Sequence, residues 1–332
     1  MKYGSLLTVL FLAGCMSAPQ DRPAWLLNPQ LNYPEAQYLV AIGEGDTRRA
    51  AENSAAAGLA RIFESRVQAE ESLSETTTEA RGAQESFYQL SELRAKIRIA
   101  SEQNLLNIQF GEVFIDHNGR VHAAAVLPRA ETAEIYRTRI DENNKAIIHL
   151  THKSDTADRP LGRFAFRRAA VRKALENDLL LAQLDIILPG VREQLSMPYD
   201  PQTLYSETAG AAQDVTFSIH LTGEGDVALR EALTGMGFSE SDDAVLRFSG
   251  NSIIEKTDLH RGSLVFVRYR YQLETHTKNG SLVLSFNGSS REGHITFEQA
   301  SARAQRSLRT EMLTEVPKEV GGYLDRLASA ER

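Results

Sequence analysis

The chain has 332 residues and a formal net charge of -7, and 42% of its residues are hydrophobic and 24% charged. This composition is typical of a folded globular protein and excludes a disordered stalk. The length is enough for two domains of ordinary size. Nucleic acid repels an acidic chain, so nucleic acid is not expected as a partner.

Residues 1–15 predict export. Lys2 precedes an apolar run over residues 6–13, which is far shorter than the roughly 20 apolar residues that cross a bilayer. A positive start, a short apolar core and small residues before a break are typical of a secretory signal peptide. The break falls at Cys15.

The string Leu12-Ala13-Gly14-Cys15 resembles the lipobox of bacterial lipoproteins. The resemblance implies that the chain is cut before Cys15 and that lipid is attached to the thiol and the amine of this residue. Two or three acyl chains anchor a protein more firmly than one does. The alternative is an ordinary signal peptide with an accidental cysteine.

The residue after Cys15 indicates which of the two bacterial membranes holds the lipid anchor. Enterobacterial lipoproteins that stay in the inner membrane usually carry Asp after the lipidated cysteine, whereas this chain has Met16. The resemblance therefore implies a lipid anchor in the bacterial outer membrane, facing the periplasm or the cell exterior. Residues 16–34 contain Pro19 and Pro23 and predict a polar tether between lipid and folded domain.

Cys15 is the only cysteine. An exported chain with one cysteine forms no internal disulfide, so we expect packing alone to stabilise it. Acylation also removes the only thiol, so a thiolate nucleophile and a cysteine-based metal site are not expected.

Residues 35–150 predict a first α+β domain. A β-rich run over 38–42 is followed by Gly43 and by a segment with apolar residues at helical spacing, for which Asp46 is the expected N-cap. The threonines of residues 66–80 favour a polar strand, and residues 86–104 return to helical spacing. Asn118-Gly119 lies between two apolar runs, which predicts a β-hairpin. A helix is expected over residues 131–150.

Residues 158–190 predict a long connecting helix. Asp158 and Pro160 lie where the N-cap and first turn of this helix belong. Together with the preceding helix it would form an antiparallel hairpin that joins two domains. Prolines and Gly190 in residues 189–201 indicate a linker.

Residues 205–332 predict a second α+β domain. Alternating apolar residues over 215–221, 267–273 and 282–286 indicate strands with one solvent-exposed face. Residues 244–254 also predict a strand. Thr296 and Gln299 form a capping box for the last helix, which Pro317 is expected to break or kink. The predicted fold class is α+β, with two small mixed or antiparallel-sheet domains, packed helices and a long helical hairpin between them.

Residues 43–46 and 223–226 are the same tetrapeptide, Gly-Glu-Gly-Asp. Either the two domains arose by internal duplication, or two unrelated sheets use a glycine turn before a helix. The Gly43-x-Gly45 pattern also invites comparison with a phosphate-binding turn. However, the third glycine of the dinucleotide pattern is missing, and Glu44 and Asp46 would repel a phosphate.

Few residues of the sequence are candidates for metal binding or catalysis. His149, His152 and Asp155 have a spacing able to hold a metal ion, but histidines at the exposed end of a helix are more often solvated. No Gly-x-Ser-x-Gly string marks a nucleophile. The sequence therefore indicates no catalytic, cofactor-binding or metal-binding residue, and only Cys15 as a lipidation site.

Four segments resemble the "Lpp-twenty" family of bacterial surface lipoproteins. They are Pro23-Ala24-Trp25, the strand and turn of residues 38–45, the alanine-rich residues 50–60 and Leu127-Pro128-Arg129. The match covers about a third of the chain and is mostly structural. The resemblance implies an outer-membrane-associated lipoprotein without known catalysis. Some members act in cell-envelope or flagellar assembly.

The favoured hypothesis is a lipid-anchored, non-enzymatic envelope protein that assembles with itself or with envelope proteins through its sheet edges. One alternative is a binding module for a small periplasmic ligand or a glycan, with a pocket between the domains. Another is a hydrolase with Ser or Asp beside a His and a donor for the oxyanion.

Overall fold

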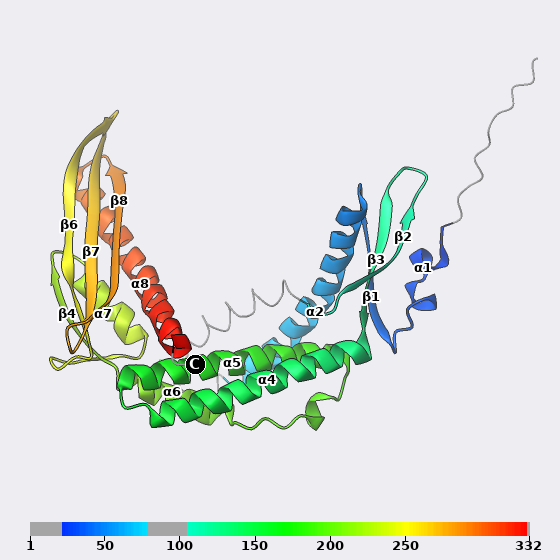
Figure 1. Cartoon of the computed structure of the whole chain (residues 1–332). Helices are drawn as coiled ribbons and strands as arrows, with labels where there is room; N and C mark the ends of the chain where they lie inside the picture. The colour runs from blue at the N-terminus through cyan, green and yellow to red at the C-terminus, as the bar shows by residue number, and fades with distance from the viewer. Residues whose placement is uncertain (1–21, 79–104, 331–332) are drawn as a thin grey trace, which may run out of the picture. The chain divides into compact units, whose positions relative to one another are not determined.

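The structure, a computed structural model, describes residues 22–78 and 105–330. Its contacts divide the chain into two compact units. Among the described residues, the first unit contains residues 22–66 and 105–133, and the second contains residues 67–78 and 134–330. Each unit has its own sheet and packed helices (Figure 1). The α+β fold class is therefore confirmed.

The sheet of the first unit has three antiparallel strands in the order β1-β3-β2. They are β1 (Tyr38–Gly45), β2 (Gln109–Ile115) and β3 (Val121–Pro128). The predicted hairpin is confirmed, because β2 and β3 flank Asn118-Gly119. One carboxylate oxygen of Asp116 accepts the backbone N–H groups of Asn118 and Arg120, each at 2.9 Å, and Gly119 has φ 80°.

Helix α2 (Arg48–Thr78) packs on one face of this sheet. Ala51, Ala55 and Leu59 are fully buried, which confirms the predicted apolar side. The helix is capped by Thr47 and not by Asp46. The Thr47 Oγ1 accepts the N–H of Ala50 at 3.2 Å, and the Thr47 carbonyl accepts that of Ala51 at 3.0 Å.

The predicted strand over residues 66–80 is wrong, because α2 continues to Thr78. Most residues of this run are good helix formers, including glutamate, glutamine, alanine and leucine. Extending a helix that has already nucleated adds one hydrogen bond for each residue fixed, so the threonines follow the helix. The helix expected over residues 86–104 lies outside the described residues.

The opposite face of the first sheet is covered by the start of the chain. Here lie α1 (Ala24–Leu27) and η1 (Pro29–Leu31). Trp25 is 6% exposed and packs with Ala124 and Val126 of β3. The part of the expected tether from Ala24 onward therefore belongs to the packed unit.

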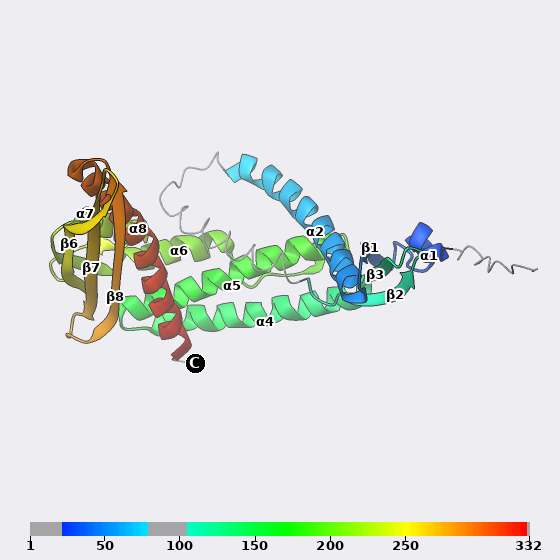
Figure 2. The ribbon, with the colours of Figure 1, turned by 90° about the horizontal axis from the view of Figure 1, so that it is seen from above.

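Helices α4 (Arg129–Thr156) and α5 (Pro160–Ile187) lie side by side (Figures 1 and 2). The buried amide of Asn177 joins them. It accepts a hydrogen bond from Asn143 at 3.0 Å and donates one to Asn144 at 2.9 Å. Both predicted helices are confirmed, but the N-cap of α5 is Arg159, not Asp158. Pro160 takes the first helical position, so the cap moves to the residue just before it.

The helical hairpin shares one hydrophobic core with the second sheet. This core combines Ile147 and Leu150 of α4 and nine buried residues of α5 with the inner face of the sheet. The expected linker contains η3 (Arg192–Gln194) and, from Pro201, a helix that the sequence did not indicate, α6 (Pro201–Gln213). The Asp200 carboxylate caps α6 by accepting the N–H of Thr203 at 2.7 Å.

The second sheet has the order β5-β4-β6-β7-β8. Its strands are β4 (Thr216–Thr222), β5 (Ser239–Glu240), β6 (Leu246–Arg261), β7 (Leu264–Thr277) and β8 (Leu282–His294). Strand β4 is parallel to β5 and β6, and the other pairs are antiparallel. The predicted alternation is confirmed: the odd residues from Val267 to Leu273 are buried.

Helices α7 (Asp226–Gly235) and α8 (Phe297–Ala330) complete the second core. The Thr296 Oγ1 accepts the N–H of Gln299 at 3.3 Å, so the expected cap forms. A break at Pro317 does not occur, because α8 continues through it. Val316 and Val320 on either side are buried, and their packing offsets the hydrogen bond that proline cannot make.

Candidate functional site

Cys15, the predicted lipidation site, lies outside the described residues, so its acylation stays a prediction. None of the described helices combines the length and the apolar character that a bilayer crossing requires.

The glycines of the repeated tetrapeptide serve packing in one unit and a turn in the other. Gly43 and Gly45 are part of β1, and a Cβ at Gly43 would overlap the backbone nitrogen of Ala55 in α2. Gly223 and Gly225 instead form the turn before α7, with φ 99° and 104°. The sheets also differ in topology, since β1 has an antiparallel partner whereas β4 has parallel ones. The shared tetrapeptide therefore carries no argument for a phosphate site.

The candidate metal ligands do not converge. His149 and His152 lie on exposed positions of α4. The Asp155 carboxylate is bonded instead to Arg167 of α5 at 2.6 Å. Within residues 22–78 and 105–330, no group of three or more His, Cys, Asp or Glu side chains is placed to hold a metal ion.

One serine lies beside a histidine on the open face of the second sheet. His220 of β4 is the register partner of Ser249 of β6, and Glu274 of β7 faces Ser249 from the other side. No hydrogen bond links these three side chains in the described part of the chain. A hydrolytic triad needs such a relay and an oxyanion donor, and the neighbouring strand N–H groups are oriented for sheet pairing.

In the first unit, no strand within residues 22–78 and 105–330 pairs with the outer side of β2. Strand β2 is at the edge of its sheet, and it exposes 45% of Phe110 and 55% of Ile115. Both are opposite β3 residues of the face on which α2 packs. The strand's one carboxylate, that of Glu112, accepts hydrogen bonds from Tyr33 and Asn32. We call Phe110 and Ile115 with the free side of β2 the β2 edge.

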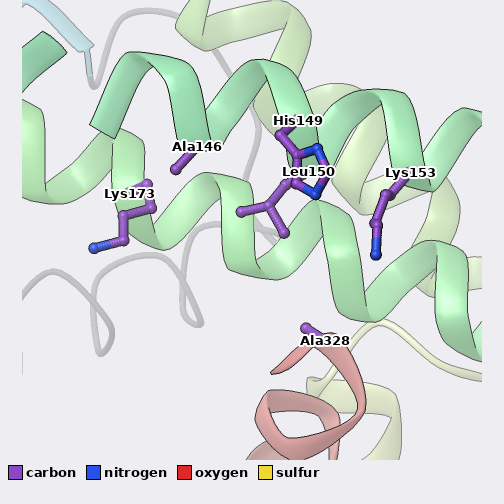
Figure 3. Close-up of a pocket in the computed structure, with 6 residues that line it drawn as sticks. All are labelled: Ala146, His149, Leu150, Lys153, Lys173 and Ala328. Carbon is purple, nitrogen blue, oxygen red and sulfur yellow. The ribbon is translucent and has the colours of Figure 1, made fainter. Parts of the chain in front are cut away.

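A groove with a basic rim lies within the second unit (Figure 3). Its volume is about 380 Å³, and α4, α5 and α8 line it. Ala146, Leu150 and Ala328 form its apolar floor, and the rim carries His149, Lys153 and Lys173. We call this the basic groove. The sequence shows these residues but not their convergence, because that depends on how three helices pack.

A buried polar cluster holds α8 against the second sheet. The hydroxyls of Tyr269 and Tyr271 donate to the Glu311 carboxylate at 2.5 and 3.0 Å. Burial raises the pKa of both tyrosines far above the ordinary value, and the Glu311 charge raises each pKa further. Gly288 of β8 leaves room for the cluster, because a Cβ there would overlap the carboxylate and the Tyr271 ring. This cluster is a structural contact.

No family model and no curated protein matches this chain. Two solved structures that it resembles are a minor lipoprotein from Acinetobacter baumannii and the secreted protein HP1454 from Helicobacter pylori. The first is 14% identical with a TM-score of 0.28, and the match covers 32% of this chain and 91% of that chain. The second is 11% identical with a TM-score of 0.39, over 83% of this chain and 98% of that chain. The resemblance to the "Lpp-twenty" family stays a prediction.

Proposed function

We propose that this is a lipid-anchored, non-enzymatic protein of the bacterial cell envelope that acts in assembly or scaffolding. In this proposal acylated Cys15 holds it at the outer membrane. Its folded units work by contact, with a second copy or with other envelope proteins. The signal pattern of residues 1–15 supports the anchor, and the β2 edge supports the mode of contact.

The β2 edge is the observation that carries this proposal. Natural proteins usually protect edge strands with charges, because unpaired backbone groups recruit further strands. Here Glu112, the only charged residue of β2, is bonded within its own unit by Tyr33 and Asn32. Phe110 and Ile115 meanwhile remain exposed. An apolar strand whose outer backbone side pairs with no described strand is suited to strand addition by a partner.

The test is crosslinking in cells with a photoreactive phenylalanine analogue at position 110. We expect discrete crosslinked species that contain either a second copy or another envelope protein. Leu282 at the edge of the second sheet is 55% exposed, as is Ile115. The matched control is therefore the same analogue at position 282, where we expect much less crosslinking.

A variant pair sharpens the test. Ile115→Thr keeps β-propensity but removes apolar surface, and we expect it to reduce crosslinking from position 110 several-fold. Leu282→Thr should leave this crosslinking unchanged. Recovery of monomer alone from position 110 would contradict the proposal, as would equal effects of the two substitutions.

The anchor is tested separately by Cys15→Ser. We expect the protein to leave the membrane fraction, because a serine cannot form the thioether to lipid. Intact-mass analysis of the parent protein should show the acyl chains. If the variant stayed in the membrane fraction like the parent protein, the proposed lipid anchor would be contradicted.

A further inference from the structure

We propose that the basic groove binds a small amphiphilic anion, a carboxylate or phosphate monoester with a short alkyl chain. The groove is formed within the second unit by α4, α5 and the end of α8. Its volume of about 380 Å³ is in the lower part of the range of roughly 300–1,000 Å³ typical of small-molecule sites.

The floor selects an apolar chain. The groove surface is mostly apolar where Ala146, Leu150 and Ala328 line it (Figure 3). Leu150 is 8% exposed and Ala328 5% exposed, and both line the groove. An alkyl chain removes that surface from water, which stabilises the complex in proportion to the apolar area covered.

The rim selects an anion. Lys153 extends beside the floor, and its ammonium lies over the Phe166 ring at 5.6 Å from the centroid. No carboxylate within the described ranges forms an ion pair with it. An aromatic face holds an ammonium without neutralising its charge, so the Lys153 charge stays available to a ligand.

The nearby carboxylates are already bonded to other cations. Glu176 accepts from Lys173 at 2.7 Å. On α8, one turn before Ala328, the Asp325 carboxylate is bonded by both Arg168 and Arg172. Among the described residues, these pairings leave the Lys153 charge uncompensated at the groove, in a chain with a net charge of -7. This charge favours an anion with an apolar tail over a neutral or cationic ligand.

Photoaffinity labelling of the full chain in isolated cell envelopes tests this site. The probe is octanoate that carries a diazirine on its alkyl chain, and mass spectrometry locates the labelled peptides. We expect label on the α4 and α5 residues of the groove. Excess octanoate or octyl phosphate should compete, whereas inorganic phosphate should not, because it lacks the chain.

Two substitutions of Lys153 test whether its charge is needed to bind the probe. Lys153→Met keeps the length of the side chain and should weaken labelling about tenfold, as expected for loss of one charge-assisted hydrogen bond. Lys153→Arg should restore most of it. Lys145→Met is the matched control on the same helix, since Lys145 is exposed and bonded to Asp141 at 2.6 Å, and it should leave labelling unchanged.

The proposal fails if an octyltrimethylammonium probe with the same diazirine labels the groove equally. It also fails if octanoate does not compete or if the labelled peptides lie outside α4, α5 and α8. An unchanged labelling yield in Lys153→Met, with its thermal unfolding like that of the parent protein, would likewise overturn it. These outcomes are independent of the β2 edge.

Discussion

The two sheets contact their helices in opposite ways. In the first unit α2 approaches β1 closely, because Gly43 and Gly45 present no side chain and small alanines of the helix face them. In the second unit the sheet meets its helices through large side chains such as Phe217, Phe248 and Leu308. The first contact therefore depends on missing atoms, and the second on atoms that fill space.

This difference predicts opposite sensitivities. Adding a carbon atom at Gly43 of β1 should damage the contact with α2, whereas removing carbon atoms from the large core side chains should damage the second unit. Hydrogen exchange measured peptide by peptide shows which unit each substitution loosens.

The largest effect is expected from truncation in the second core. Phe248 is fully buried, and Phe248→Ala should lower the free energy of unfolding by about 3–5 kcal/mol, from lost burial and the cavity left behind. Urea unfolding measures the loss, and hydrogen exchange should rise in β6 and β7. A loss below about 1 kcal/mol would show that this core is not tightly packed.

Adding one methyl group in the first unit should come next. Gly43→Ala places a Cβ against the backbone of Ala55, and we expect a loss of about 2–3 kcal/mol from the forced shift of α2. Exchange should rise in β1 and α2. Gly210→Ala in α6 is the control, because a Cβ there meets nothing within 4 Å. It should stabilise by about 0.5 kcal/mol. Equal effects of both variants would contradict the close approach of α2.

Substitutions at Asn177 measure how much its buried hydrogen bonds between α4 and α5 contribute to stability. Asn177→Leu leaves Asn143 and Asn144 buried with a lost partner, and we expect it to cost about 2 kcal/mol. Because replacing both partners removes the unpaired group, Asn143→Leu combined with Asn177→Leu should cost less than the sum of the two single variants. If the losses of unfolding free energy measured in urea were strictly additive, a direct coupling between Asn143 and Asn177 would be contradicted.

The smallest effect should be a loss of stability in alkali that is specific to the second unit. The pKa values of Tyr269 and Tyr271 are raised by burial and by Glu311, so folding favours their neutral forms. Their contribution is complete below the unfolded pKa of about 10 and is lost as pH rises above it. At about pH 10, where half of these tyrosines are ionised in the unfolded chain, we expect the two together to lose about 1 kcal/mol.

Urea midpoints measured between about pH 9 and 11 check this dependence. Tyr269→Phe with Tyr271→Phe should flatten the pH profile, whereas Glu311→Gln should retain part of it, because burial persists without the charge. A profile as steep in the double variant as in the parent protein would disprove the assignment.

Much of the fold was predictable because its signals are local. The Asn118-Gly119 hairpin, the alternation over residues 267–273 and the Thr296 cap each depend on a few neighbouring residues. Such signals act within one turn or one strand, so the sequence alone reveals them. The lipobox-like string that ends at Cys15 is a local signal of the same kind.

Tertiary packing decided the rest. The threonines before residue 78 follow a helix that was already nucleated, and α8 passes Pro317 because buried valines hold it on both sides. The parallel pairing of β4 with β6 and the exposure of β2 depend on contacts between segments far apart in the chain. The basic groove has the same origin, since Lys153, Lys173 and Ala328 meet only after three helices pack. Local propensity assigns most elements, but only long-range burial determines which of their faces stay open to a partner or a ligand.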